Sequence, residues 1–222
     1  MAVGPTGALV VELVGPPGTG KSTLLAAVAG DRATVVGNPR IRDLTSRAVI
    51  AAAALRSLAT LVRRRALVRG WMREQVRTMT NVRLWPRLLA RGDPAVRLYV
   101  FDQGPVFFLT RGLLMNDRLA PWWRETVTAW ASILDAVVLL DAPDEILLPR
   151  IEGREKPHAL KGAGVEEAGA SLAGVRRVYE DFVAELAGRP GGPAIMRFDT
   201  SRSTLPEIAR ELLALVDVAP SR

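Results

Sequence analysis

The sequence contains no cysteine and only one histidine, His158, which excludes a disulfide framework, a thiol nucleophile and a metal site built from cysteine or histidine clusters. Lysine is also rare, because the 30 basic residues include only Lys21, Lys156 and Lys161. No stretch of about 18 uncharged apolar residues is present, and the first residues lack the charged and apolar regions of a secretory leader. We therefore expect a cytoplasmic protein.

What the chain does contain is typical of one folded domain. Of its 222 residues, 49% are hydrophobic and 24% are charged, a composition too apolar for a disordered segment. Because domains commonly have about 150 residues, we treat residues 1–222 as a single domain with insertions.

The positive charge of the chain is concentrated in one segment. The formal net charge is +7, and residues 40–91 hold 13 arginines against only Asp43 and Glu74. Four of these arginines recur every four residues and are expected on one face of a helix: Arg65, Arg69, Arg73 and Arg77. Because like charges at this spacing repel, either the face is solvated or it binds an anionic partner such as a phosphate-bearing ligand, a membrane or a nucleic acid.

Short apolar runs alternate with helical segments along the chain. Strands are predicted at residues 9–14, 34–36, 97–101, 136–140 and 195–198, and helices at 21–29, within 43–84 and at 204–216. Gly70 divides the long helical segment, Pro86 is expected to open a further short helix that ends at Gly92, and Thr204 and Glu207 have capping-box spacing. The alternation predicts an α/β fold with a mainly parallel sheet, covered on both faces and carrying an arginine-rich helical insertion at 41–92.

The strongest motif follows the first predicted strand. Residues 15–22 read GPPGTGKS and match the phosphate-binding pattern G-x-x-x-x-G-K-[ST] in full, between a strand and a helix as the motif requires. In such a loop the backbone N–H groups converge on phosphate oxygens, the lysine reaches the terminal phosphates and the serine hydroxyl takes a Mg²⁺ position. We therefore predict that a magnesium nucleoside triphosphate contacts Gly15, Pro16, Pro17, Gly18, Thr19, Gly20, Lys21, Ser22 and Thr23.

Carboxylates follow the third and fourth predicted strands. Asp102 comes directly after the strand at 97–101 and is expected at the rim of the nucleotide site, where it would help to hold Mg²⁺ or accept a proton from an attacking hydroxyl. The alternative is that Asp102 caps the following helix. Asp144 follows the strand at 136–140, and we expect it to cap the next helix rather than to bind a ligand.

Residues 150–164 are dense in cations and flanked by glycines, which is typical of a mobile lid. Cations delivered by a closing lid stabilise the charge that develops in phosphoryl transfer and exclude water. We therefore predict a catalytic role for Arg154 first, then for Arg150 and Lys156, with an exposed charged loop as the alternative. His158 lies in the same segment and receives no role.

These features together resemble the P-loop nucleoside and nucleotide kinases, most closely thymidylate kinase and deoxynucleoside kinases. The matching positions are residues 15–23, 38–40, 102, 140–145, 150, 154 and 199–201, which spread over nearly the whole chain. The resemblance implies a five-stranded parallel sheet in the order 2-3-1-4-5, an arginine-bearing lid after the fourth strand, and transfer of a phosphoryl group from ATP, with Mg²⁺, to a small-molecule acceptor. A nucleoside or nucleoside monophosphate is the expected acceptor.

The resemblance also implies an adenine-contacting loop at Thr200, Ser201 and Arg202, and an acceptor side that includes Arg40. We expect Asn38, Gln103 and Arg73 on that side as well. Thymidylate kinases usually carry Asp-Arg where this chain has Asp102 and Gln103, and Glu-Pro-Gly at residues 38–40, so the donor and the reaction type carry over better than the acceptor. Members of the family are often homodimers.

Two other functions stay open. GPPGTGK is also the loop of oligomeric AAA ATPases, although that group places a glutamate where this chain has Gln103 and adds a C-terminal helical domain. The other alternative is a nucleotide-switched module that binds a membrane or an anionic polymer through residues 56–91. In the run 48–62 only Arg56 is charged, and we expect burial in the core rather than peripheral membrane contact for this run. A nucleic-acid partner is not expected.

Overall fold

The computed structural model describes residues 8–29, 34–39, 41, 46–68, 70–93, 95–155 and 158–218. At its centre lies a sheet made of β1 (Leu9–Val14), β2 (Thr34–Val36), β3 (Leu98–Phe101), β4 (Ala136–Asp141) and β5 (Ala194–Asp199). The strand order is β2-β3-β1-β4-β5, and all neighbouring strands are parallel. The predicted α/β class and strand order are therefore confirmed.

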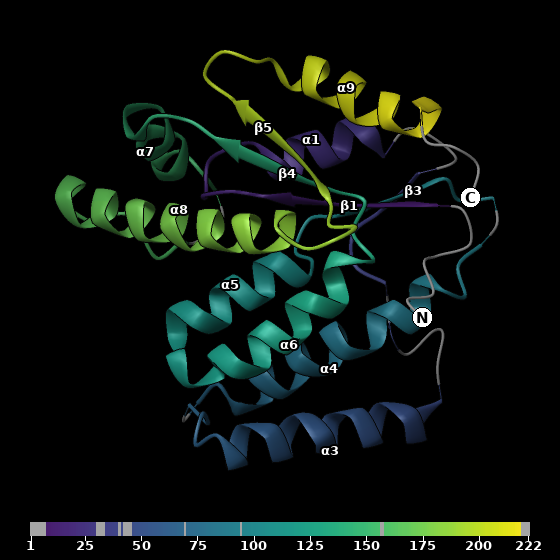
Figure 1. Cartoon of the computed structure of the whole chain (residues 1–222). Helices are drawn as coiled ribbons and strands as arrows, with labels where there is room; N and C mark the ends of the chain where they lie inside the picture. The colour runs from purple at the N-terminus through teal and green to yellow at the C-terminus, as the bar shows by residue number, and fades with distance from the viewer. Residues whose placement is uncertain are drawn as a thin grey trace.

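Helices cover both faces of this sheet (Figure 1). They are α1 (Lys21–Val28), α3 (Arg47–Arg63), α4 (Met72–Leu89), α5 (Pro105–Met115), α6 (Ala120–Ala131), α7 (Asp144–Glu152), α8 (Val165–Ala187) and α9 (Leu205–Val218), with a short 3₁₀ helix η1 (Asp117–Leu119). Helices α1 and α9 pack on one face, and α4, α5, α6 and α8 form the layer on the other. Helix α3 lies outside that layer and packs on α4.

The core on the α4–α6 side is built around large aromatic side chains. Trp85 and Trp130 are fully buried and pack edge to face, with ring centroids 6.4 Å apart, while the Phe101 ring lies 5.4 Å from Trp85 and 6.2 Å from Trp130. Each such ring buries a large apolar area, so this cluster anchors the helical layer to β3. The indole N–H of Trp85 also donates to the Pro39 carbonyl at 3.1 Å and thereby ties α4 to the turn after β2.

The prediction that Pro86 opens a new helix is wrong, because Pro86 lies inside α4. Proline has no N–H, so it cannot donate to the carbonyl four residues earlier, which belongs to Val82. The indole N–H of Trp130 on α6 donates to that Val82 carbonyl at 3.2 Å. A bond from the neighbouring helix therefore replaces the missing helical bond, and α4 continues to Leu89.

The predicted arginine face is also wrong in part. Arg65 lies in the connection between α3 and α4 and has a left-handed backbone (φ 51°), as does Gly70 (φ 82°), so the helical segment is divided near Gly70, as predicted, and Arg65 is not on the same helix as Arg73. Arg73 and Arg77 are on α4, and Arg69 lies outside the described residues. The four arginines therefore do not form one helical row.

The bounds of the five strands, of α1 and of α9 agree with the sequence to within two residues. Helix α9 begins at Leu205, and the predicted capping contact is present in one direction, because the Thr204 N–H donates to a Glu207 carboxylate oxygen at 2.8 Å. The expectation that Asp144 caps α7 is wrong: Pro143 is the N-cap residue and Asp144 instead pairs with Arg176 on α8. Asp144 is thus the first residue of α7, one position beyond the cap, and its carboxylate is engaged by the ion pair.

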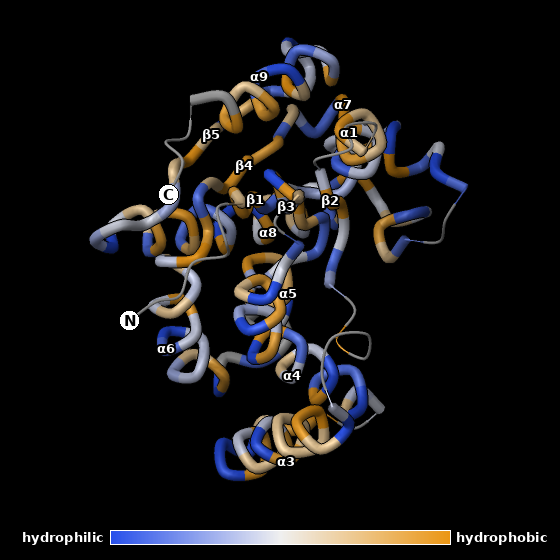
Figure 2. The backbone as a smooth tube through the Cα atoms, turned by 90° about the vertical axis from the view of Figure 1, so that its right-hand side faces the viewer, coloured by the Kyte–Doolittle hydropathy of each residue, from blue (hydrophilic) through white to orange (hydrophobic). Residues whose placement is uncertain are grey.

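Helix α3 is less buried than its apolar sequence predicts. Only Ala53, Ser57, Thr60 and Leu61 are buried in it, and they face α4. Figure 2 shows α3 at the end of the molecule opposite α9, with apolar segments despite this peripheral position. Within the described ranges, no helix combines the length and the apolar character needed to cross a bilayer.

Candidate active site

The phosphate-binding loop occupies the turn between the end of β1 and the start of α1, as predicted. Gly15 has φ 138°, and a Cβ atom added there would lie 1.9 Å from the Leu140 carbonyl oxygen. Gly20 also has a left-handed backbone (φ 84°), and no side chain caps α1. The loop therefore requires glycine for steric reasons, and no side chain competes with an anionic ligand at the start of α1.

Lys21 crosses this loop from the first position of α1. Its ammonium donates to the carbonyl oxygens of Gly15 (2.8 Å) and Pro16 (2.7 Å) and to the Thr19 hydroxyl (3.1 Å). Desolvation in the loop, followed by the positive charge of Arg154, lowers the pKa of Lys21 to about 8. The ammonium thus lacks a fully compensating anion, and a bound phosphate would supply that anion.

A cleft of about 930 Å³ extends from this loop. It is lined on one side by Gly15 and residues 17–23, and it continues past β3 to α5, the segment after α7, and α8. Of the predicted catalytic and metal residues, the cleft lining includes Lys21, Ser22, Asp102, Arg150 and Arg154. The structure therefore brings these predicted residues to one site, whereas Lys156 lies outside the described part of the chain.

Asp102 and Gln103 form the turn after β3 at the centre of the cleft. The negative charge of Asp102 raises the pKa of Lys21, in opposition to the larger effect of burial, so the two groups are close enough to interact. The expected alternative role of Asp102 as a helix cap is not found: Gly104 is the N-cap residue of α5, with no side-chain bond. The backbone carbonyl of Gln103 accepts a hydrogen bond from the Asn38 amide at 2.8 Å, which joins this turn to the one after β2.

Of the two arginines predicted on the acceptor side, the structure describes only Arg73. Arg73 is exposed in the first turn of α4 and is not part of the cleft lining, so the structure does not support its predicted substrate contact. Arg40 lies outside the described residues. Phe107, Thr110 and Arg111, which lie within about one turn of each other on α5, line the cleft instead.

Glu12 is a buried carboxylate that sequence reasoning missed. It lies fully buried in β1, and its two oxygens accept the backbone N–H groups of Val106 (2.9 Å) and Phe107 (2.8 Å) in the first turn of α5. Burial raises the pKa of Glu12 to about 8, while the backbone hydrogen bonds act in the opposite direction. The residue thus fixes the start of the helix that follows Asp102. An acidic residue inside an otherwise apolar strand was the available signal.

Arg150 lies on α7 rather than in a separate lid. Its guanidinium donates to the hydroxyl (3.1 Å) and the carbonyl (3.2 Å) of Thr200, and it approaches the Gly18 carbonyl at 3.5 Å. It therefore bridges the phosphate-binding loop and the turn after β5, two segments that were predicted to contact the nucleotide. Thr200 lines the cleft, whereas Ser201 and Arg202 are exposed and contact Asp199.

Arg154 and His158 lie on the segment that follows α7, and both line the cleft. Partial burial, together with the nearby positive charges of Arg154 and Lys21, lowers the pKa of His158. A neutral imidazole is therefore favoured at neutral pH. Its Nδ1 atom accepts the Leu160 N–H at 3.1 Å, which helps to order the segment.

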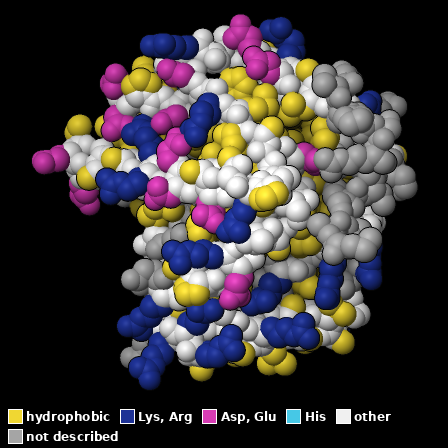
Figure 3. Space-filling model, in the orientation of Figure 1, with side chains coloured by type: hydrophobic (Ala, Val, Ile, Leu, Met, Phe, Trp, Pro, Cys, Tyr) yellow, Lys and Arg dark blue, Asp and Glu magenta, His cyan; other side chains and the backbone are white. Residues whose placement is uncertain are grey.

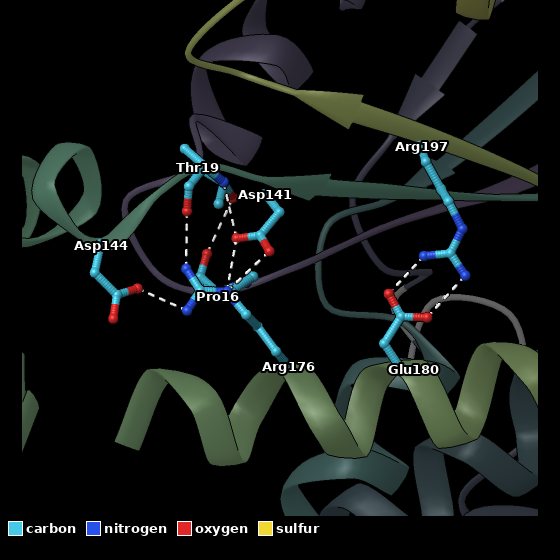
Figure 4. Close-up of polar contacts among 8 residues, drawn as sticks. Pro16, Thr19, Asp141, Asp144, Arg176, Glu180 and Arg197 are labelled. Atoms are coloured by element: carbon cyan, nitrogen blue, oxygen red, sulfur yellow. Dashed lines mark hydrogen bonds and ion pairs between the residues drawn. The ribbon is translucent and has the colours of Figure 1, made fainter. Parts of the chain in front are cut away.

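An ion-pair cluster supports the site from the side of α8 (Figure 4). Arg176 donates to Asp141 at the end of β4 (2.8 Å) and to the Ala142 carbonyl (2.8 Å), and it contacts Asp144 at the start of α7 (2.6 Å). The cluster borders a separate open cavity of about 680 Å³ that does not include the phosphate-binding loop. Because Arg176 joins β4, α7 and α8, its evident role is to hold these elements in register beside the loop. Sequence reasoning missed it, since Arg176 and Asp141 are 35 residues apart.

Comparison with known proteins gives matches among solved structures. Thymidylate kinase from Candida albicans superimposes with a TM-score of 0.55 at 12% identity, covering 95% of this chain and 91% of that one. Deoxyadenosine kinase from M. mycoides with bound dATP gives 0.54 at 16% identity, covering 92% and 98%. YorR protein from Bacillus subtilis, in complex with phosphorylated GDP, gives 0.53 at 16% identity, covering 94% and 96%.

No protein-family model matches the sequence, and a search of curated proteins finds no match. The structural likenesses extend over nearly the whole length of each chain, so they concern the complete architecture rather than the phosphate-binding loop alone. At 12–16% identity they establish the fold. The chain therefore has the P-loop α/β fold found in nucleoside and nucleotide kinases.

Proposed function

We propose that the protein is a P-loop kinase that transfers the γ-phosphoryl group of ATP to a nucleoside or a nucleoside monophosphate. The observation that carries the proposal is that the phosphate-binding loop, Asp102 and the α5 residues Phe107 and Arg111 line the same cleft. A motor or switch ATPase needs only a nucleotide site and a water molecule. A transferase also needs room for an acceptor next to the phosphates, and the continuation of this cleft past Asp102 to α5 and α8 supports that function.

On the donor side, the loop and the first turn of α1 would hold the phosphates. The N–H groups at the start of α1 and the Lys21 ammonium would bind the β- and γ-phosphate oxygens. Arg154 lines the same cleft as Lys21 and lies close enough to lower the pKa of Lys21, so we expect its guanidinium to face the transferred group. Arg150 would hold the adenine side, because it already joins the loop to Thr200.

Magnesium fits the oxygen donors of this cleft. The described residues contain no group of three acidic or histidine side chains that would hold a metal by themselves. Mg²⁺ in P-loop proteins, however, is bound by one or two protein oxygens together with phosphates and water. The Ser22 hydroxyl and the Asp102 carboxylate both line the cleft and would be its ligands. When bound, the ion would neutralise charge on the phosphate oxygens.

On the acceptor side, Asp102 would orient the attacking hydroxyl or phosphate and accept its proton. Gln103 offers an amide and Phe107 an apolar ring in the same cleft, which suits a flat heterocycle with polar edges. Arg111 would attract a monophosphate group, since it lies one turn further along α5.

The test is ATP turnover with and without a panel of nucleosides and nucleoside monophosphates, with ADP and the phosphorylated product quantified together. We expect ADP release that depends on the acceptor, with one product formed for each ADP. Lys21→Ala should abolish transfer and Asp102→Asn should lower kcat by about 100-fold or more. Asp181→Asn, an exposed aspartate on α8 away from the cleft, is the matched control and should be unchanged.

Hydrolysis of ATP at the same rate with every acceptor, without a phosphorylated product, would reject the kinase. Normal turnover in Lys21→Ala would reject the assignment of the loop.

A further inference from the structure

The exposed apolar side chains of the molecule are concentrated at one end of the helical layer. Eight large apolar side chains are exposed within the described ranges, and two of them, Val35 and Val165, lie elsewhere. The other six belong to α3, the α3–α4 connection, the start of α4 and the end of α5: Leu55 (66% exposed), Val62 (55%), Leu67 (41%), Trp71 (43%), Met72 (47%) and Leu114 (50%). We call these six residues the apolar end.

Helix α3 presents an apolar line on the side away from α4. Leu55 and Val62 are seven residues apart, and the exposed Ala48, Ala52 and Ala59 continue the same line with spacings of three and four residues. Residues at this spacing lie on one helical face. The opposite side, with Ser57 and Thr60, is buried against α4. The α3 axis therefore lies along the molecular surface with an apolar stripe facing outwards.

The neighbouring connection is held in place rather than left loose. The Gln75 side chain accepts the Val68 N–H and donates to the Ala66 carbonyl, both at 3.0 Å. The Arg118 side chain donates to the Arg65 carbonyl at 2.9 Å, and the Arg111 guanidinium stacks on the Trp71 ring at 5.4 Å. The α3–α4 connection and the end of α5 thus form one surface, and its exposed apolar groups are part of the fold.

The same surface is strongly cationic. Residues 44–73 contain seven arginines and no acidic residue. The nearest carboxylates of α4 and α6, Glu74 and Glu125, are already paired with Arg77 and Arg64. Figure 3 shows basic side chains gathered over the lower part of the molecule, with apolar groups between them, whereas acidic side chains are concentrated on the upper part.

We propose that the apolar end docks onto an anionic lipid bilayer, with α3 lying in the plane of the headgroups. A helix with an apolar stripe flanked by arginines is suited to this position, because the stripe enters the acyl boundary while the guanidinium groups contact lipid phosphates. Arg56 and Arg63 stand next to Leu55 and Val62 and are exposed. Apolar burial and charge complementarity therefore act on the same face.

Two other occupants fit less well. A nucleic acid would satisfy the arginines, but it offers nothing to aliphatic groups such as Leu55 and Val62. Among the described residues of this surface, Trp71 is the one exposed aromatic ring, and one face of it is occupied by Arg111. A second copy of the chain, related by two-fold symmetry, would bring the same arginine-rich surface into contact with itself. The bilayer alone matches both the apolar and the cationic groups.

The test is sedimentation of the full chain with vesicles of phosphatidylcholine alone or with 30% phosphatidylglycerol. We expect binding to the anionic vesicles, with a blue shift of the Trp71 emission, and at least tenfold weaker binding to the neutral ones. Leu55→Gln with Val62→Gln should weaken anionic-vesicle binding by at least tenfold. Arg56→Gln with Arg63→Gln should weaken it by roughly fivefold per arginine. Val165→Gln, a more exposed valine at the start of α8, is the matched control and should bind normally.

Equal binding to both vesicle types, or an equal loss in the Val165 control, would overturn the proposal. If the unchanged protein is a dimer that does not bind vesicles, and the Leu55 and Val62 substitutions make it a monomer, the surface would be assigned to a second copy of the chain. Tighter binding to a single-stranded DNA 20-mer that survives these changes would assign it to a polyanion. Thermal unfolding followed by circular dichroism checks that the variants fold. The emission shift of Trp71 tests the surface of the unchanged protein directly, and Trp71→Phe gives the emission of the other tryptophans as background. Because Lys21→Ala should bind vesicles normally, this proposal can fail or stand independently of the kinase activity.

Discussion

The donor side and the acceptor side of the cleft are built in different ways. On the donor side, residues 15–23 are contiguous, and Lys21 bonds to backbone atoms only five and six residues away. On the acceptor side, Glu12 reaches residues 94 and 95 positions later, and Asn38 reaches Gln103 across 65 residues. One half is thus encoded by a local motif and the other by long-range packing. The two halves should respond differently to matched substitutions.

The largest contrast is expected between two glycines. Gly15→Ala would place a methyl group 1.9 Å from the Leu140 carbonyl, at a φ that alanine rarely adopts, so the loop must deform. We expect nucleotide affinity to fall by more than about 100-fold. Gly112→Ala in α5 meets no atom within 4 Å and should stabilise the protein by about 0.5–1 kcal/mol, because alanine favours the helix. Calorimetric nucleotide titration and urea unfolding measure the two effects.

If Gly15→Ala kept its nucleotide affinity, the loop would tolerate displacement and the donor side would not be sterically fixed. If Gly112→Ala instead lowered stability, α5 would be more closely constrained than the open space around Gly112 indicates.

A second, smaller effect concerns Glu12, which anchors the acceptor helix. Glu12→Gln leaves an amide N–H₂ facing a buried backbone N–H, and an unsatisfied buried donor costs about 1–3 kcal/mol. The pH dependence sharpens the test. The pKa of Glu12 is about 8 in the folded protein and 4.5 in the unfolded chain, so the folded protein stays protonated to a higher pH. The free energy of unfolding therefore falls as the pH rises between these two values.

The glutamine variant lacks this titration, so the cost of the substitution should be greatest near pH 5 and smallest near pH 8. Urea unfolding of both proteins at several pH values gives the difference directly. A cost that grows with pH would mean that the buried carboxylate is ionised and that its two backbone hydrogen bonds outweigh desolvation.

The smallest expected effect is a difference between the KM for ATP and the KM for the acceptor. Arg150→Met removes the bonds between the phosphate-binding loop and Thr200, and it should raise the KM for ATP by about tenfold with little effect on the acceptor KM. Gln103→Leu should do the reverse, because its side chain lines the acceptor half while its backbone contact with Asn38 is retained. Initial rates with each substrate varied in turn provide both values. Joint changes of both KM values in either variant would show that the halves are not independent.

This difference also explains which parts of the molecule could be predicted from the sequence. The five strands were predicted because each is a short apolar run, and the loop because its glycine and lysine spacing is nearly unique. Asp102 and Arg154 both line the cleft, because each follows closely on an element whose position the fold fixes. Local order in the chain was enough for these features.

The missed features depend on contacts between distant segments. Arg176 pairs with Asp141 across 35 residues, and Tyr179 on the same helix contacts the Gly15 backbone across a larger separation. Arg73 was expected on the acceptor side because it belongs to the arginine-rich helical segment, but it is exposed in the first turn of α4 and does not line the cleft. Periodicity predicts which residues share a helical face, but the packing of distant segments determines what that face contacts.

The bond between Trp130 and the Val82 carbonyl gives the acceptor layer a cooperative character. Because Pro86 leaves α4 unable to complete its own ladder of hydrogen bonds, the last turns of α4 reach full bonding only when α6 is alongside. Separating the two helices would leave both the Val82 carbonyl and the Trp130 indole N–H without this hydrogen bond, so the loss of either helix destabilises the other. We therefore expect α4 and α6 to melt together, because a residue that usually ends a helix makes one of them depend on a bond from the other.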